Sequence, residues 1–237
     1  GTLYIDTNTN NEPDGAGEIL TVGESFTQAD INAGRLKYDH DGSDTNTDSF
    51  QVDVTDIANN ETSNQTVNIT VTPADTEVTL AGGVLIITDV NGGGDSADQL
   101  TISYSGSTYT ITDTGGLTID ASSITGSATN GTASLTVPDT GITGLNFNVL
   151  GGNDSVTVNS VQASLSGDFT IDGGSGVDSA VINAVIASTG TVDISVSRNI
   201  VVNSGSSITT TTGDITLTAN RGMSAVTGDF DGIYIDN

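Results

Sequence analysis

The stretch that decides the fold is Ser166–Asn183, with the sequence SGDFTIDGGSGVDSAVIN. Phe169 and Ile171 alternate with polar residues, as in a strand with one buried face. A glycine-rich G-G-x-G-x-D segment follows and ends at Asp178, and a second apolar run, SAVI, comes directly after it. Glycine and aspartate at this density indicate a tight turn. The stretch is therefore compatible with a hairpin, a cation-binding turn or one coil of a repeating solenoid.

A regular spacing around this stretch favours the solenoid. Four glycines follow one another at intervals of 23 residues: Gly144, Gly167, Gly190 and Gly213. Each follows Thr or Ser and precedes a run of alternating apolar and polar residues. Three pairs of similar residues are instead 24 residues apart: Phe147 and Ile171, Asp154 and Asp178, and Asn159 and Asn183. This difference requires a one-residue insertion in the first coil. A period in the twenties with short strands is typical of solenoids, in which each coil hydrogen-bonds the next. The spacing predicts a parallel β-solenoid, or β-helix, with coils of about 23 residues and a stacked asparagine ladder.

The composition restricts the class of protein. Hydrophobic residues make up 34% of the 237 residues and aromatic residues only 4%, so the core is expected to consist of Val, Ile, Leu and Ala. Thirty acidic residues against four basic ones give a net charge of −26, which repels nucleic acid and anionic membranes. No apolar run approaches the roughly 20 residues of a membrane span, so we expect no membrane insertion. The absence of cysteine excludes disulfides and cysteine-based metal sites.

The sequence changes character near Ala74, which predicts two domains, 1–73 and 74–237. Pro73 and the polar residues after it are typical of a linker, and the regular coils begin at about residue 139. Thr27 followed by Asp30 predicts a capped helical turn that Gly34 ends. Residues 74–138 contain strand-like runs without the regular spacing, so irregular coils, a cap and a small meander all remain open there. The strands expected in the first domain are Leu3–Ile5, Gly34–Tyr38, Ser49–Val54 and Gln65–Val71.

Two runs in the first domain resemble a known family. FTQADINAGRLKYDHDGS (Phe26–Ser43) and DSFQVDVTD (Asp48–Asp56) are similar to cadherin-like repeats of the chondroitin sulfate proteoglycan type, which are common in giant bacterial surface proteins. The resemblance covers about residues 1–72 and implies an extracellular cadherin/Ig-like β-sandwich that acts as a spacer or adhesive module. One or two strands of such a repeat would precede Gly1, so the sandwich is expected to be partial and the sequence a piece of a longer protein.

A second, low-complexity resemblance concerns the other domain. TTTTGDITLTANRG (Thr209–Gly222) is similar to repeats of filamentous haemagglutinin-type adhesins, which form parallel β-helices. The glycine-rich turn at Gly173–Asp178 also resembles the calcium repeat of toxin-type β-rolls. That repeat requires consecutive motifs about nine residues apart. Here Asp154, in the related turn GGND, and Asp178 are 24 apart. Glycine–aspartate turns selected for their backbone angles are therefore the alternative to calcium binding.

Oxygen-bearing side chains in turns are the candidate ligands for Ca²⁺, a hard cation. The run DTNTNNEPD begins like an EF-hand loop but has Asn11 and Gly17 where that loop requires Gly and Glu, which excludes a standard EF-hand. VDVTDIANN resembles the inter-repeat calcium ligands of cadherins. The predicted ligands are Asp6, Asn8, Asn10, Asp39, Asp41, Asp44, Asp48, Asp53, Asp56, Asp154, Gly176 and Asp178.

The function expected from these patterns is mechanical and non-enzymatic: a structural segment of a bacterial cell-surface adhesin, stalk or filament, secreted or surface-bound. The two ends, GTLYIDTN and DGIYIDN, are alike, which predicts a homopolymer or contact with neighbouring repeats through strand complementation; an arbitrary boundary is the alternative. The first rival is an adhesin tip that binds cell-surface glycans or a receptor through clustered aromatic residues. The second is a polysaccharide-degrading β-helix enzyme with a carboxylate pair within about 10 Å. The scarcity of aromatic and basic residues argues against both rivals.

Overall fold

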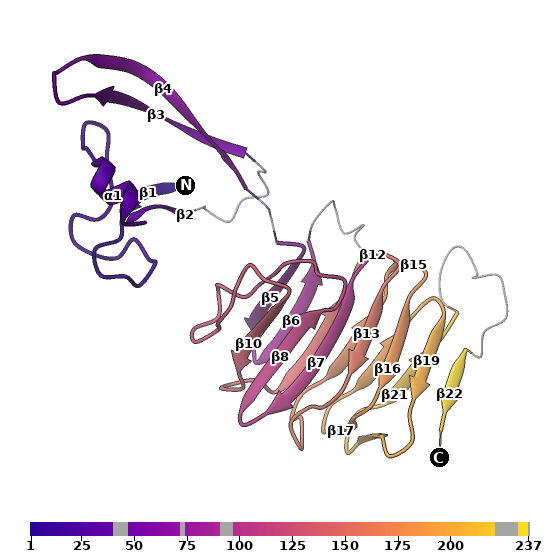
Figure 1. Ribbon diagram of the computed structural model, residues 1–237. Coiled ribbons are helices and arrows are strands. Elements are labelled where there is room, and N and C mark those ends of the chain that lie inside the picture. Colours follow the sequence, from indigo (N-terminus) through magenta and orange to yellow (C-terminus); the bar gives the residue numbers. More distant parts are fainter. Residues whose placement is uncertain (40–46, 72–73, 91–96, 221–231, 237) are drawn as a thin grey trace. The chain divides into compact units, whose positions relative to one another are not determined.

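The chain divides into two compact units, Gly1–Pro73 (unit 1) and Ala74–Asn237 (unit 2). The computed structural model describes residues 1–39, 47–71, 74–90, 97–220 and 232–236 (Figure 1). Within those residues it contains 22 strands and a single five-residue helix. The predicted all-β class is therefore confirmed.

Unit 1 contains two separate pairs of antiparallel strands. β1 (Thr2–Ile5) pairs with β2 (Leu36–Asp39), and β3 (Thr47–Thr55) pairs with β4 (Glu61–Thr70). Nine of the ten residues of β4 are exposed, and Tyr4 is the one fully buried hydrophobic residue among those described in this unit. The partial sandwich expected from sequence thus appears as two strand pairs, and the described residues give them no common apolar core.

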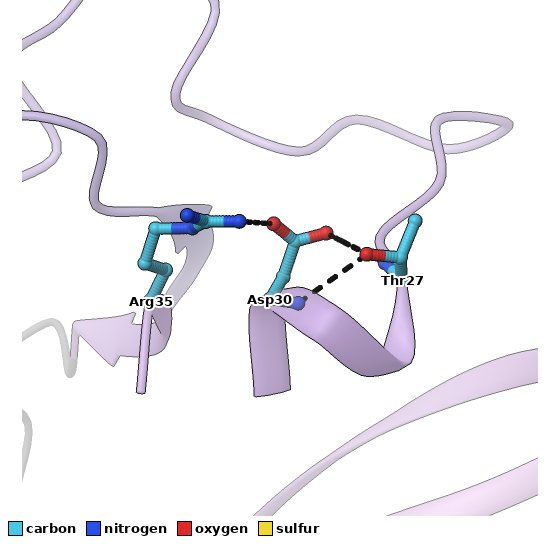
Figure 2. Close-up of polar contacts among 3 residues, drawn as sticks. All are labelled: Thr27, Asp30 and Arg35. Carbon is cyan, nitrogen blue, oxygen red and sulfur yellow. Dashed lines mark hydrogen bonds and ion pairs between the residues drawn. The ribbon is translucent and has the colours of Figure 1, made fainter. Parts of the chain in front are cut away.

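The single helix, α1 (Gln28–Asn32), is fixed by its ends. The Thr27 side chain accepts a hydrogen bond from the Asp30 amide, and the Asp30 carboxylate accepts bonds from the Thr27 amide and hydroxyl, which makes a capping box (Figure 2). Arg35 forms an ion pair of 2.6 Å with Asp30. Gly34 follows the helix with φ of +67°, a conformation that favours glycine. The capped turn predicted from sequence is confirmed.

Unit 2 contains two seven-stranded sheets of mixed direction. The strand orders are β10-β8-β7-β13-β16-β19-β22 and β21-β18-β14-β11-β6-β5-β9, and β12-β15 and β17-β20 form two small parallel pairs. The bounds are β5 Thr76–Ala81, β6 Val84–Asp89, β7 Gln99–Ser105, β8 Thr108–Asp113, β9 Ile119–Asp120, β10 Ser134–Pro138, β11 Gly144–Asn148, β12 Gly151–Gly152, β13 Ser155–Val158, β14 Phe169–Asp172, β15 Ser175–Gly176, β16 Ser179–Ile182, β17 Val185–Ser188, β18 Val192–Ser195, β19 Asn199–Val202, β20 Ser207–Thr210, β21 Ile215–Thr218 and β22 Ile233–Ile235.

The C-terminal part of both sheets is parallel and follows the predicted spacing. Leu145 lies opposite Phe169, Phe169 opposite Val192, and Val192 opposite Ile215, so the steps along the chain are 24, 23 and 23. The one-residue insertion in the first coil is therefore confirmed. Phe147 and Phe169 are fully buried, and their ring centroids lie 6.2 Å apart. Matching apolar side chains thus form one continuous core along the parallel strands.

Successive parallel strands, with the turns that join them, lie one above the next, and we call each such level a rung. Two columns of identical residues confirm that the rungs stack. A Cβ on Gly190 would lie 2.9 Å from the carbonyl carbon of Gly167, and one on Gly213 would lie 2.5 Å from that of Gly190, so neighbouring rungs approach too closely for a side chain. Asn183 donates to Asn159 at 3.0 Å and accepts from Asn203 at 2.6 Å. The predicted asparagine ladder is confirmed and extends to Asn203.

Most strand pairs within residues 74–138 are antiparallel, and only the short β5-β9 pair is parallel, which explains why the regular spacing is absent there. β5 pairs with β6, and β7 pairs with β8, which pairs with β10. The hairpins turn at Gly82–Gly83 and Gly106–Ser107, where all four residues have positive φ. Two consecutive residues of positive φ match the twist of a hairpin. Of the irregular coils, cap and small meander that the sequence left open for this region, these antiparallel hairpins are closest to the meander.

Candidate functional site

Three buried aspartates occupy equivalent positions on neighbouring strands of unit 2. Asp98, Asp154 and Asp178 directly precede β7, β13 and β16, whose first residues pair in register. Their exposed fractions are 0%, 2% and 1%. Carboxylates are rarely buried to this degree without a partner. Because the three strands pair in register, the three aspartates lie one above the next. We call Asp98, Asp154 and Asp178 the aspartate column.

Backbone amides hydrogen-bond the aspartate column from rung to rung. The Asp98 amide donates to Oδ1 of Asp154 at 2.9 Å, and the Asp154 amide donates to Oδ1 of Asp178 at 3.2 Å. The Asp178 amide donates to Oγ of Ser197 at 2.7 Å, so a hydroxyl takes the place of the carboxylate on the next rung, just before β19. The second oxygen, Oδ2, of all three aspartates is buried without a hydrogen-bond partner among the described residues. Each carboxyl group therefore has one oxygen left for a proton or a cation.

The pKa values of the aspartate column are raised, mainly because burial disfavours the charged form. Burial, together with the nearby Asp89, raises the pKa of Asp98 to about 7. Burial, together with the charge of Asp178, raises the pKa of Asp154 to about 8. The pKa of Asp178 is also raised, with burial as the largest cause. Burial therefore favours the protonated, uncharged form of these carboxyl groups.

Further buried aspartates surround the column. Asp75, Asp89 and Asp113 are 4%, 0% and 2% exposed, and all three raise the pKa of Asp98. Asp113 accepts a hydrogen bond from the Gln99 amide at 2.8 Å. It thus bonds a backbone amide of a neighbouring strand, as Asp154 and Asp178 do, but on the antiparallel side of β7. Sequence reasoning selected Asp154 and Asp178 but not these residues. The signal for Asp98 was its position directly before an alternating strand, as in the other two rungs.

The predicted ligands Asp154, Gly176 and Asp178 do lie on stacked turns. Gly176 pairs with Gly152 in the short β12-β15 ladder, and its φ is +126°. A Cβ on Gly176 would lie 1.4 Å from the Gly152 carbonyl oxygen, so glycine is required by both backbone angle and space. Within the described residues, no group of three or more Asp, Glu, His or Cys side chains is placed to hold a metal ion. A cation in this turn would therefore need backbone carbonyl ligands.

The first predicted cluster of unit 1 is an internally bonded turn. Asp6 is 4% exposed and accepts from the amides of Thr9 at 2.7 Å and Asn11 at 3.3 Å. The Asn8 and Asn10 side-chain amides both donate to Asp14, at 3.2 and 2.9 Å. The carboxylates thus bond the loop itself, which is the usual role of Asp and Asn in turns. The described geometry gives these residues a structural role.

The remaining predicted ligands of unit 1 that the structure describes do not form a metal-binding group. Asp48 accepts from the Tyr38 hydroxyl, which is the main cause of its lowered pKa. Asp53 accepts from an amide across the β3-β4 hairpin, and Asp56 accepts from Asn60, whose side chain is the main cause of the lowered pKa of Asp56. Asp39 is exposed at the end of β2. The two other candidates, Asp41 and Asp44, lie outside the described residues.

Two shallow hollows in unit 2 bear on the glycan-binding and enzymatic alternatives. One, of about 330 Å³, lies on the outer face of β11, β14 and β18 and contains Asp172 and Asp193 among amide and hydroxyl side chains. The other, of about 480 Å³, is lined by Leu80, Ile124 and Pro138 together with small polar residues. Neither has an aromatic or basic residue in its lining. Sugar-binding clefts usually stack the sugar on aromatic rings, and such rings do not line either hollow.

Comparison with known proteins finds a similarity for one part of the chain. Residues 8–71 match the family model described as cadherin-like. The match falls within unit 1 and confirms the cadherin-like part of the sequence resemblance. No curated protein and no solved structure matches the chain.

The cadherin-like match is consistent with an extracellular or surface location and with an adhesion-type structural segment. Cadherin-like domains are typically non-enzymatic, and they commonly bind calcium. Among the residues described, no helix has the length and apolar character needed to cross a membrane. The resemblance of unit 2 to haemagglutinin-type repeats has no counterpart among the matches.

Proposed function

We propose that the chain is a non-enzymatic structural segment of a bacterial cell-surface adhesin, stalk or filament, in which unit 2 is a parallel β-solenoid. The observation that carries this proposal is the row of parallel strands β11-β14-β18-β21, whose residues pair at steps of 24, 23 and 23. Each rung satisfies the backbone groups of its neighbour and extends the same apolar core. Such a stack supplies length and stiffness, which are the properties of a spacer.

The surface of unit 2 supports a structural role over a catalytic one. The buried carboxylates of Asp154 and Asp178 accept hydrogen bonds from backbone amides of adjacent rungs, so they help to hold the stack together. Its two hollows are shallow and lack the basic and aromatic residues that orient a polysaccharide. The partner class that remains consistent with this surface is another protein copy or a neighbouring repeat. Binding to cell-surface glycans remains the rival prediction, and a glycan array tests it.

Force spectroscopy on the full chain, held by its two ends, tests the structural proposal. We expect unit 2 to lengthen in discrete steps, because rungs that share a core and a hydrogen-bond ladder detach cooperatively. Ile171→Asp places a charge at a position 1% exposed and should remove the steps, whereas Ile57→Asp, at a position 108% exposed, should leave them unchanged. Smooth extension of the unaltered chain, as for an unfolded polypeptide, would contradict the proposal.

Calcium is proposed as a stabilising ion of the unit 2 turns. Asp154 and Asp178 lie on adjacent rungs, each with a buried Oδ2 atom that has no hydrogen-bond partner among the described residues. The neighbouring Gly176 brings its backbone onto the turn beneath, and carbonyl and carboxylate oxygens are the ligands that Ca²⁺ prefers. A bound Ca²⁺ would neutralise the buried charges and link the two rungs. In unit 1 the carboxylates of Asp6, Asp48, Asp53 and Asp56 accept internal hydrogen bonds, so we do not extend the proposal there.

Thermal melting in CaCl₂ and in EDTA tests the calcium proposal. An ion bound only by the folded state raises the melting temperature, by several degrees at saturating concentration. Asp154→Asn and Asp178→Asn should remove this shift, and Asp193→Asn, on the exposed outer face of β18, should keep it. If the unaltered chain melts at the same temperature in both media, calcium is not a ligand of the folded state.

A further inference from the structure

The aspartate column crosses the boundary between residues 74–138, the hairpin part of unit 2, and the coils that follow. Asp98 precedes β7, which pairs antiparallel with β8, and Asp154 precedes β13, which belongs to the coils. β7 and β13 are neighbouring parallel strands (Figure 1). The Asp98 amide donates to Oδ1 of Asp154 at 2.9 Å, as the Asp154 amide does to Oδ1 of Asp178 at 3.2 Å. Asp98 and Asp154 therefore repeat, one rung away, the arrangement of Asp154 and Asp178.

The pair Asp98 and Asp154 is buried and offers oxygen atoms to a ligand. Asp98 is 0% exposed and Asp154 is 2% exposed. The Oδ2 atom of each has no hydrogen-bond partner among the described residues, and a buried polar atom without a partner costs free energy. Thr76, which is 0% exposed on β5 of the other seven-stranded sheet, donates its hydroxyl to Oδ1 of Asp98 at 3.0 Å. Two carboxyl oxygens without partners and a hydroxyl from the opposite sheet are thus available at this pair.

Negative charge is concentrated around Asp98. Burial is the largest cause of its raised pKa, and the charges of Asp89, Asp113 and Asp75 raise the pKa further because they disfavour a second negative charge nearby. The whole chain has four basic residues against thirty acidic ones. Buried carboxylates are stabilised by a bound cation, which supplies charge of the opposite sign where water is excluded. The surroundings of Asp98 therefore favour a cation at this rung.

The spacing of the rungs suits a Ca²⁺ ion that bridges two of them. Neighbouring strands lie about 4.8 Å apart, and Ca²⁺ binds oxygen at about 2.3–2.6 Å, so one ion can contact carboxylates on two adjacent rungs. Ca²⁺ takes about six to eight oxygen ligands, neutral as well as charged. Among the described residues, no third Asp, Glu, His or Cys side chain is placed to join the pair. Hydroxyl and backbone carbonyl oxygens would therefore complete the ligand set.

We propose that Asp98 and Asp154 bind a second Ca²⁺, so that the aspartate column holds two ions, one between each pair of adjacent aspartates. This inference rests on the calcium proposal for Asp154 and Asp178, because the two ions share Asp154. The second ion joins the hairpin part of unit 2 to the coils, through β7 on one side and β13 on the other. It thus stabilises the junction at which antiparallel pairing gives way to parallel pairing.

Equilibrium dialysis of the full chain against CaCl₂ counts the bound ions, in about 0.15 M salt to screen the exposed carboxylates. We expect two ions in the unaltered chain and one in Asp98→Asn, because the amide keeps the shape of the side chain but not its charge. Asp113→Asn is the matched control and should keep two ions: Asp113 is 2% exposed and accepts from a backbone amide, but it lies outside the column. The double variant Asp154→Asn with Asp178→Asn, in which the calcium effect on melting is lost, should bind none.

Circular dichroism checks that each variant folds. Asp98→Ser is a second variant, also expected to bind one ion, because the rung of β19 carries a serine, Ser197, in place of the aspartate. One ion in the unaltered chain, unchanged in both Asp98 variants, would overturn the second site and leave the calcium proposal standing. Two ions that persist in both Asp98 variants, or an equal loss in Asp113→Asn, would also overturn the second site. No bound ion in the unaltered chain would overturn both proposals.

Discussion

Aspartate carboxyl groups behave in opposite ways in the two units. In unit 1, Asp30 accepts hydrogen bonds from Thr27 and pairs with Arg35, and its pKa is lowered to about 2. In unit 2, burial is the largest cause of the raised pKa values of Asp98 and Asp154, which are about 7 and about 8. The same side chain thus fixes exposed turns in one unit and links buried rungs in the other. The difference shows that a count of acidic residues does not predict their role.

The two units differ equally in their cores. All buried hydrophobic residues of the described chain except Tyr4 belong to unit 2. Unit 1 is instead held by hairpin pairing and by side-chain bonds within turns, such as that of Glu18, which accepts from the Thr7 amide at 2.9 Å. Substitutions of buried hydrophobic residues should therefore lower the free energy of unfolding of unit 2 strongly. Unit 1 offers few buried positions at which the same change could be made.

The largest effect is expected from Phe169→Ala. Phe169 is 0% exposed and packs on Phe147, so its removal leaves a cavity between rungs and should lower the free energy of unfolding of unit 2 by about 3–5 kcal/mol. Ile57→Ala, at a position 108% exposed in unit 1, should change stability by less than about 0.5 kcal/mol. Denaturant unfolding followed by circular dichroism measures both. Equal effects of the two changes would show that unit 2 has no packed core.

The next effect concerns two glycines that both have positive φ. Gly176→Ala places a Cβ 1.4 Å from the Gly152 carbonyl oxygen, whereas no atom lies within 4 Å of a Cβ on Gly116. We expect Gly176→Ala to cost about 2–3 kcal/mol, through backbone strain and the displaced rung. Gly116→Ala should cost about 1 kcal/mol, through backbone strain alone. Thermal unfolding of both variants measures the difference, and a smaller loss for Gly176→Ala would contradict the close approach of the stacked turns.

The pH dependence should separate the units. A folded-state pKa raised to about 7 means that Asp98 stabilises unit 2 fully below about pH 4 and that this contribution is lost as the pH rises through 7. In EDTA, unit 2 should therefore lose on the order of 2 kcal/mol between pH 5 and pH 9. Asp98→Asn should flatten this profile, while Asp193→Asn, an exposed control, should not. A profile that rises with pH would contradict the burial of the column.

The smallest effect is expected at the helix cap of unit 1. Thr27→Ala removes the hydroxyl of the capping box and should cost about 1 kcal/mol. The pKa of Asp30, now about 2, should move towards its ordinary value because the Thr27 hydroxyl is the largest cause of its lowering. The stabilisation by Asp30 is present above its ordinary pKa and is lost as the pH falls through 2. NMR titration of the Asp30 carboxyl measures the shift, and an unchanged pKa in the variant would show that the cap is absent in solution.

The sequence predicted the parallel rungs because stacking repeats the same side chains at a fixed interval. Phe147, Ile171 and Ile194 could be aligned by spacing alone. The 24-residue interval between Asp154 and Asp178 indicated the one-residue insertion in the first coil. The hairpins of residues 74–138 escaped this search because antiparallel strands share no common interval. Their Gly82–Gly83 turn was the available signal.

The site was predicted only in part, for related reasons. Asp98 and Asp154 are 56 residues apart in the sequence, because the additional strands β8, β9 and β10 lie between their two rungs in the chain. No regular interval therefore pointed to Asp98. In unit 1, Asp6 and Asn8 matched the start of a calcium loop, yet the same residue types also bond their own backbone in turns. Sequence alone does not separate these two uses.

The most direct test of the account is the register of the rungs in unit 2. Thr170 lies opposite Asp193, and Asp193 lies opposite Thr216. Neighbouring strands are about 4.8 Å apart, within the Cα range of a disulfide, whereas strands two rungs apart are about 10 Å apart and beyond it. In this cysteine-free chain, we predict that Thr170→Cys with Asp193→Cys forms an intramolecular disulfide and that Thr170→Cys with Thr216→Cys does not. No disulfide in the first pair, or equal formation in both pairs, would contradict the stacked-rung structure.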